Sequence, residues 1–99
     1  MREIYYGDFR EMVIRHYREI AAGAPEFQST EWFLLRYLKR IGNAADMPVT
    51  PGRLENSMRG FIRFYVDQID ERTELGRTCI SIYEEYRKTL RRSQQRQPG

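Results

Sequence analysis

Four segments of this 99-residue chain place apolar residues three and four positions apart, and short runs rich in Gly, Pro and polar residues separate them. Such spacing keeps side chains on one face of an α-helix, because the helix turns once every 3.6 residues. It predicts helices at about 9–22, 30–41, 51–69 and 73–92. No segment sustains the alternation of apolar and polar residues that indicates a strand. We therefore expect an all-α fold, a small antiparallel bundle of four helices.

Residues with special backbone preferences mark the ends of these helices. We expect Gly23 and Gly42 to close the first two helices, because glycine readily adopts the left-handed conformation that often follows a helix. Ser29 or Thr30 is a candidate N-cap for the second helix, since a hydroxyl can accept an otherwise unpaired backbone N–H. The Thr-Pro pair at 50–51 is typical of an N-cap and the first residue of a helix.

The third and fourth apolar stripes are out of phase with each other. The six residues from Ile69 to Leu75 correspond to about 600° of helix rotation, which misses a continuous seam by about 120°. A turn at residues 70–73, capped by Asp70 or Thr73, would remove this mismatch. The alternative, one long helix over both segments, would need a partner to cover both stripes. We therefore predict two separate helices.

The positive charge of the chain is concentrated near its C-terminus. The chain has 17 Lys and Arg residues against 14 Asp and Glu residues. Between positions 87 and 96 there are five basic residues and no acidic one: Arg87, Lys88, Arg91, Arg92 and Arg96. Cations favour the C-terminal end of a helix, so we interpret them as the end of a single helical domain at 1–92, followed by a flexible polar tail at 93–99. The alternative is a basic tail that binds polyanions.

Several classes of protein are disfavoured by composition. No apolar run approaches the ~20 residues that a membrane span requires, so we expect no membrane association. A single cysteine cannot form a disulfide framework, and it indicates a reducing compartment. We therefore expect a cytoplasmic protein.

Side chains that could perform chemistry are few. His16 is the single histidine, and Cys79, the single cysteine, lies in a different predicted helix. A hydrolytic zinc site needs three protein ligands, and no glycine-rich phosphate-binding motif is present. We interpret both residues as packing residues; the alternative is a nucleophile pair formed by Cys79 and His16. The sequence therefore predicts a non-catalytic protein without a cofactor or a metal site.

The second helix carries the most informative exposed pattern. Its members follow the spacing i, i+4, i+7 and i+8, opposite the apolar stripe of that helix: Trp32, Arg36, Lys39 and Arg40. Aromatic and Arg residues often dominate the binding energy of interfaces, so this pattern favours a docking face for an acidic partner. The structural alternative is that Trp32 packs under a loop while the guanidinium of Arg36 stacks on its indole.

These observations favour a small helical interaction module, an adaptor, regulatory or assembly protein that binds a protein partner through the second helix. Wide apolar stripes on the last two helices also predict a homo-oligomer, a dimer or larger; they include Phe64, Val66, Ile80 and Tyr83. The alternative function is nucleic-acid binding through the cations of the second helix and the C-terminal basic tail. A helix-turn-helix is disfavoured, because nine residues join the second and third helices.

Overall fold

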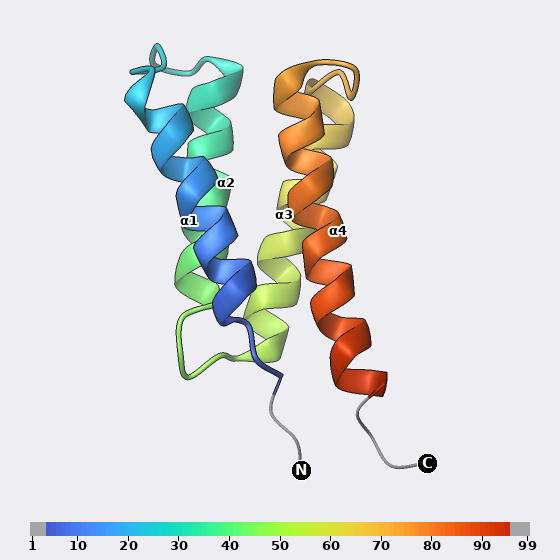
Figure 1. Cartoon of the computed structure of the whole chain (residues 1–99). Coiled ribbons are helices and arrows are strands. Elements are labelled where there is room, and N and C mark those ends of the chain that lie inside the picture. The colour runs from blue at the N-terminus through green and yellow to red at the C-terminus, as the bar shows by residue number, and fades with distance from the viewer. Residues whose placement is uncertain (1–3, 96–99) are drawn as a thin grey trace.

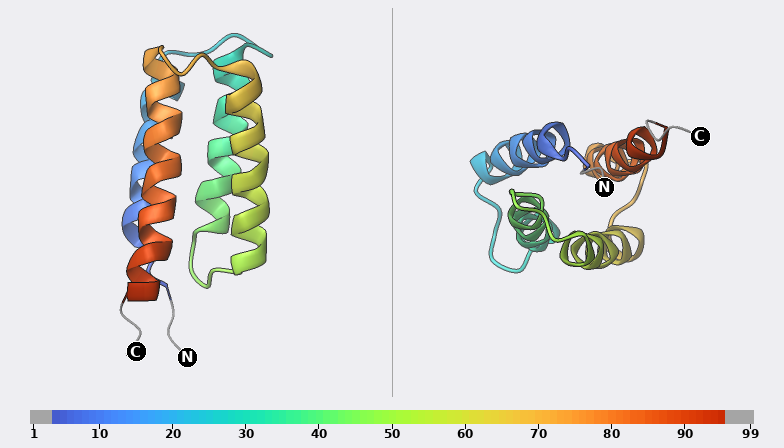
Figure 2. Two further views of the ribbon diagram at one scale, coloured as in Figure 1. Left: turned by 90° about the vertical axis from the view of Figure 1, so that its right-hand side faces the viewer. Right: turned by 90° about the horizontal axis from the view of Figure 1, so that it is seen from below.

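The computed structural model describes residues 4–95 and the side chains of residues 4–92. This part of the chain forms four helices, α1 (Gly7–Ala22), α2 (Thr30–Ala44), α3 (Pro51–Gln68) and α4 (Glu74–Gln95). Successive helices run in opposite directions (Figure 1). Each helix packs against two others around a ring in the order α1, α2, α3, α4, which is visible along the bundle axis in Figure 2. The predicted all-α antiparallel bundle is confirmed.

Side chains from all four helices form one core. Ten of them are fully buried: Phe9, Val13, Leu34, Leu38, Ile41, Leu54, Met58, Phe61, Cys79 and Ile82. The ring of Phe9 lies 5.6 Å from that of Tyr86 and links α1 to α4 across this core. Burial of apolar surface is the main favourable term in folding, so the apolar stripes read from the sequence are what hold the four helices together. None of the described helices is long and apolar enough to cross a membrane.

The helices begin and end close to the predicted positions, and three of their ends differ by two or three residues. α1 begins at Gly7 rather than at residue 9, and α2 continues to Ala44 rather than ending at residue 41. α4 extends to Gln95, three residues beyond its predicted end. The remaining residues of the predicted flexible tail, 96–99, lie outside the described residues.

Of the two glycines that were expected to close helices, Gly23 follows the end of α1 without the expected left-handed conformation, and Gly42 does not end α2. After α1, Gly23 keeps a right-handed φ of −77° and Ala24 takes the positive φ of 48° instead. α2 continues through Gly42, whose carbonyl accepts a hydrogen bond from Nε of Arg10 in α1 at 3.0 Å. A Cβ at Gly42 would already lie 3.8 Å from Ile14. Packing against α1 therefore outweighs the weak helix preference of glycine.

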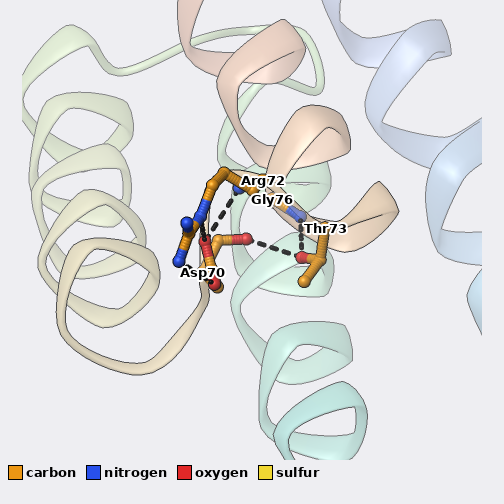
Figure 3. Close-up of polar contacts among 4 residues, drawn as sticks. All are labelled: Asp70, Arg72, Thr73 and Gly76. Carbon is orange, nitrogen blue, oxygen red and sulfur yellow. Dashed lines mark hydrogen bonds and ion pairs between the residues drawn. The ribbon is translucent and has the colours of Figure 1, made fainter.

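The predicted break between the third and fourth helices is present, and both predicted caps take part in it (Figure 3). The Thr73 hydroxyl accepts the Gly76 N–H at 3.0 Å and donates to the Asp70 carbonyl at 2.6 Å. The Asp70 carboxylate accepts the Arg72 N–H at 2.9 Å, and these bonds to Arg72 lower the pKa of Asp70. Position 76 requires glycine, because a Cβ there would lie 2.6 Å from the Cα of Glu71.

The residues behind the predicted self-association differ in exposure. The side chain of Val66 is 64% exposed. Phe64 is half-buried, because its ring stacks on Tyr37 of α2 at 4.9 Å. Ile80 and Tyr83 on α4 are also half-buried. Self-association therefore stays a prediction.

Candidate functional site

One helix positions all the side chains of the predicted docking surface. We call these residues the basic/aromatic face of α2: Trp32, Arg36, Lys39 and Arg40. The opposite side of α2 is fixed in the core by Leu34, Leu38 and Ile41, so the basic/aromatic face points away from the interior. The N-terminus of α2 is fixed as well, because the Ser29 hydroxyl accepts the Trp32 backbone N–H at 3.2 Å. The predicted serine cap is therefore confirmed.

The four residues of this face line a single hollow of about 370 Å³ on the surface. Tyr17 of α1 contributes to the lining, together with Leu35 and Asn43 of α2. No carboxylate is among these lining residues. Clustered charges of one sign in a concave site concentrate the electrostatic potential, so the hollow is suited to an acidic group.

Aromatic rings surround Trp32 at one end of the hollow. The ring of Phe27, in the connection before α2, lies edge-on to the indole at 4.9 Å. The ring of Phe33 also meets the indole edge-on, with the ring centroids 5.0 Å apart. The guanidinium of Arg36 stacks at 5.1 Å from the indole centroid. The stacking of Arg36 on the indole belongs to the structural alternative, in which Trp32 packs under a loop. Trp32 is nevertheless only half-buried, and Phe27 remains 73% exposed. Trp32 is therefore held in place within a partly exposed aromatic cluster.

Two of the three cations of the hollow contact aromatic rings, and none of the three pairs with a carboxylate among the described side chains. Arg40 lies 5.8 Å from the centroid of Tyr37, and Arg36 stacks on Trp32. The ion pairs found among the described side chains are Arg10–Asp46, His16–Glu19, Arg59–Glu55 and Arg72–Asp70, and none involves a cation of this face. A cation–π contact leaves the charge in place, so these groups remain available to an acidic ligand.

Four residues of the site were not found from the sequence: Tyr17, Leu35 and Asn43 in the lining of the hollow, and Phe27 beside Trp32. Tyr17 follows the core spacing of α1, so periodicity assigned it to the interior. Phe27 lies outside every helix, and the periodic pattern therefore says nothing about it. A single aromatic residue in a connection otherwise rich in Gly, Pro and polar residues, five positions before Trp32, was the available signal.

The second set of predicted binding residues is separate from this face. Four exposed cations lie along the C-terminal half of α4: Arg87, Lys88, Arg91 and Arg92. Arg87 stacks on Tyr83 at 5.7 Å, and Arg96 lies outside the described residues. Within residues 4–95, α4 packs against α1 and α3 but not against α2. The two basic regions are therefore distinct surfaces.

The residues considered for catalysis lie in different environments. His16 is half-buried, with Nδ1 3.6 Å from a Glu19 carboxylate oxygen. Cys79 is fully buried, and burial raises the pKa of its thiol to about 12. Such a thiol stays protonated and is a poor nucleophile. In the described part of the chain, no group of three or more His, Cys, Asp or Glu side chains is placed to hold a metal ion.

Comparison of the chain with protein-family models, with curated proteins and with solved structures found no match.

Proposed function

We propose that this chain is a non-catalytic helical interaction module of the cytoplasm, an adaptor, regulatory or assembly protein, which binds a protein partner through the basic/aromatic face of α2. The observation that carries the proposal is the hollow of about 370 Å³ lined by Trp32, Arg36, Lys39 and Arg40. Aromatic anchors and Arg residues are the types that dominate interface energies. A surface that combines both around a concavity without carboxylates fits an acidic protein segment.

The chemistry of the face favours a segment with two kinds of side chain. A carboxylate entering the hollow would meet Arg36, Lys39 and Arg40, which have no carboxylate partner among the described side chains. An apolar side chain next to it would cover the exposed ring of Phe27 and the edge of Trp32. The anchor would supply most of the affinity, and the charges would mainly accelerate association.

The charge distribution favours a protein over a nucleic acid. Outside residues 87–96, the chain has 12 basic and 14 acidic residues. A body with this balance attracts a phosphate backbone weakly, whereas nucleic-acid affinity depends mainly on phosphate contacts. We expect weak binding to duplex DNA that is lost near physiological salt, and protein binding that survives it.

Affinity capture from the source organism, with and without nuclease, tests the proposal. The full chain is compared with Trp32→Ala and with the matched control Val66→Ala, which removes an exposed apolar side chain from α3. We expect a protein that is retained after nuclease treatment by the wild type and the control and is lost with Trp32→Ala.

The alternative function, nucleic-acid binding, is distinguished by the salt dependence of its affinity. For a nucleic-acid ligand, log K falls with log salt at a slope of roughly −0.9 per duplex phosphate neutralised. Arg36→Ala, Arg40→Ala and deletion of residues 87–99 would each flatten that slope. Tight, salt-sensitive binding of a 20-base-pair duplex that depends on Arg36 and Arg40 would show that the protein-docking proposal is wrong.

A further inference from the structure

The two ends of the bundle differ in charge. One end, at the top of Figure 1, holds the α1–α2 and α3–α4 connections. The segments that form it, 18–31 and 67–77, contain seven acidic and three basic residues. The other end holds the last turns of α4, where Arg87, Lys88, Arg91 and Arg92 are exposed. The acidic connections therefore lie at one end of the 48 Å long axis, and the four exposed cations of α4, the basic end of that helix, lie toward the other end. The start of α1 and the α2–α3 connection, which contain Asp8, Glu11 and Asp46, share that second end.

A recess of about 580 Å³ opens at the acidic end, and all four helices or their adjoining turns contribute to it. Its apolar lining is buried or half-buried and consists of Ile20, Ile69 and Leu75. Its carboxylates differ in their partners. Asp70 is paired with Arg72, and Glu19 lies beside His16. Glu31 and Glu74 are exposed, and no ion pair involves them among the described side chains.

The basic end of a chain cannot reach the recess of the same chain. Arg87 and Arg91 follow Glu74 by 13 and 17 residues in the same continuous helix, which separates their backbones from Glu74 by about 20 Å and about 26 Å at 1.5 Å per residue. Neither side chain spans that distance, so the described cations of α4 can meet the recess only in a second copy.

We propose that copies of this chain associate head to tail, with the basic end of α4 in one copy docked in the acidic recess of the next. Arg side chains suit both parts of the recess. Their guanidinium groups can bind the Glu31 and Glu74 carboxylates through two parallel hydrogen bonds. Their aliphatic stems can cover Ile20, Ile69 and Leu75.

Such an interface joins two different surfaces, so each added copy presents a new free recess and a new free basic end. A heterologous contact of this kind produces rings or open chains rather than a closed two-fold dimer. The basic/aromatic face of α2 takes no part in it. The assembly would therefore display several copies of that face, which raises the apparent affinity for a multivalent partner.

Sedimentation of two complementary variants tests the proposal. Glu31→Gln/Glu74→Gln removes charge from the recess, and Arg91→Gln/Arg92→Gln removes charge from the basic end. All four side chains are exposed, so the bundle should keep its fold, which circular dichroism checks. We expect each variant alone to lose at least tenfold in self-association. An equimolar mixture should form a complex that stops at two copies, because one intact recess and one intact basic end remain.

Arg53→Gln/Arg63→Gln provides the matched control, because it removes two exposed cations from α3 and should associate as the wild type does. The unmodified protein gives a second measurement. Its average mass should rise with concentration at low salt without stopping at a dimer, and it should fall at about 1 M salt, where the Debye length is about 3 Å. A wild-type monomer under all these conditions would overturn the proposal. So would a dimer that both variants retain, since that result indicates lateral pairing through residues such as Val66.

Discussion

The two faces of α2 belong to one helix but differ in what their side chains contact. On the inner face, Leu34, Leu38 and Ile41 are at most 1% exposed and are covered by other parts of the same chain. On the outer face, the cations of Arg36 and Arg40 contact aromatic rings and border a hollow. The inner face is covered within the folded chain, whereas no described residue fills the hollow on the outer face. Stability and binding should therefore be separable by substitutions on opposite sides of one helix.

The largest effect is expected on the inner face. Leu38→Ala removes a fully buried side chain, and such truncations lower the free energy of unfolding by about 2–5 kcal/mol because they leave a cavity. Urea denaturation measures this loss, and binding by the folded variant should be unchanged. A loss below about 1 kcal/mol would mean that the inner face is less tightly packed than described.

Trp32→Ala should give the reverse pattern. Truncation of an aromatic anchor commonly weakens binding by 2 kcal/mol or more, about 30-fold in Kd. The loss of unfolding free energy should be smaller than that of Leu38→Ala, because the indole is only half-buried. Calorimetric titration with the captured partner measures the change in Kd, with Val66→Ala as the control. A Kd within twofold of the wild type would remove Trp32 from the interface.

The thiol of Cys79 extends the comparison to pH, because it belongs to the same core as the inner face of α2. Its pKa is raised to about 12 in the folded state, whereas an unfolded cysteine ionises near ~8.5. Ionisation of the thiol therefore favours the unfolded chain, and the free energy of unfolding decreases as the pH rises above the pKa of the unfolded cysteine. We expect the unfolding free energy to fall by about 1 kcal/mol between about pH 8 and 9.5.

Cys79→Ser serves as the comparison for this pH dependence. The variant should lose most of the decline and retain a smaller part from Tyr6, Tyr65 and Tyr86, because burial raises their pKa values as well. It should keep partner binding, since Cys79 is interpreted as a packing residue. An equal decline in the variant would assign the pH dependence to other groups. Loss of function in a folded Cys79→Ser or His16→Gln variant would reopen the catalytic interpretation.

The smallest effects are expected for single cations of the outer face. Arg36→Ala and Arg40→Ala should each slow association by about threefold at low salt, because exposed charges mainly steer the encounter. Arg63→Ala on α3 is the matched control, since it removes an exposed cation outside the hollow. Stopped-flow measurement of the association rate separates these effects. An Arg36 or Arg40 effect larger than that of Trp32→Ala would reverse the assignment of anchor and charges.

Local patterns predicted those features of the fold that depend on local physics. The phase shift between Ile69 and Leu75 predicted the α3–α4 turn, and Asp70 and Thr73 provide its hydrogen bonds. The predicted end of α2 was wrong, because the helix continues through Gly42. The carbonyl of Gly42 accepts a hydrogen bond from Arg10 of α1, and its Cα faces Ile14 of the same helix. Such contacts between segments distant in sequence are not contained in the pattern of one segment.

The candidate site shows the same division. Helical spacing brought together Trp32, Arg36, Lys39 and Arg40, which do line one hollow. Two other features of the site depend on how α1 and the α1–α2 connection lie beside α2. Tyr17 of α1 lines the hollow, and the ring of Phe27 contacts the indole of Trp32. Helix periodicity predicts the direction in which a side chain points around the helix axis, but it does not predict which residues of other segments contact that side chain.

The most direct test of the central claim uses Trp32 itself, because it is the single tryptophan of the chain and lines the hollow. Its fluorescence is followed during titration with the captured partner after nuclease treatment, at about 150 mM and about 500 mM salt. The account predicts a saturable change in emission at both salt concentrations. Binding that leaves the Trp32 emission unchanged, or an emission change produced only by duplex DNA at low salt, would contradict it.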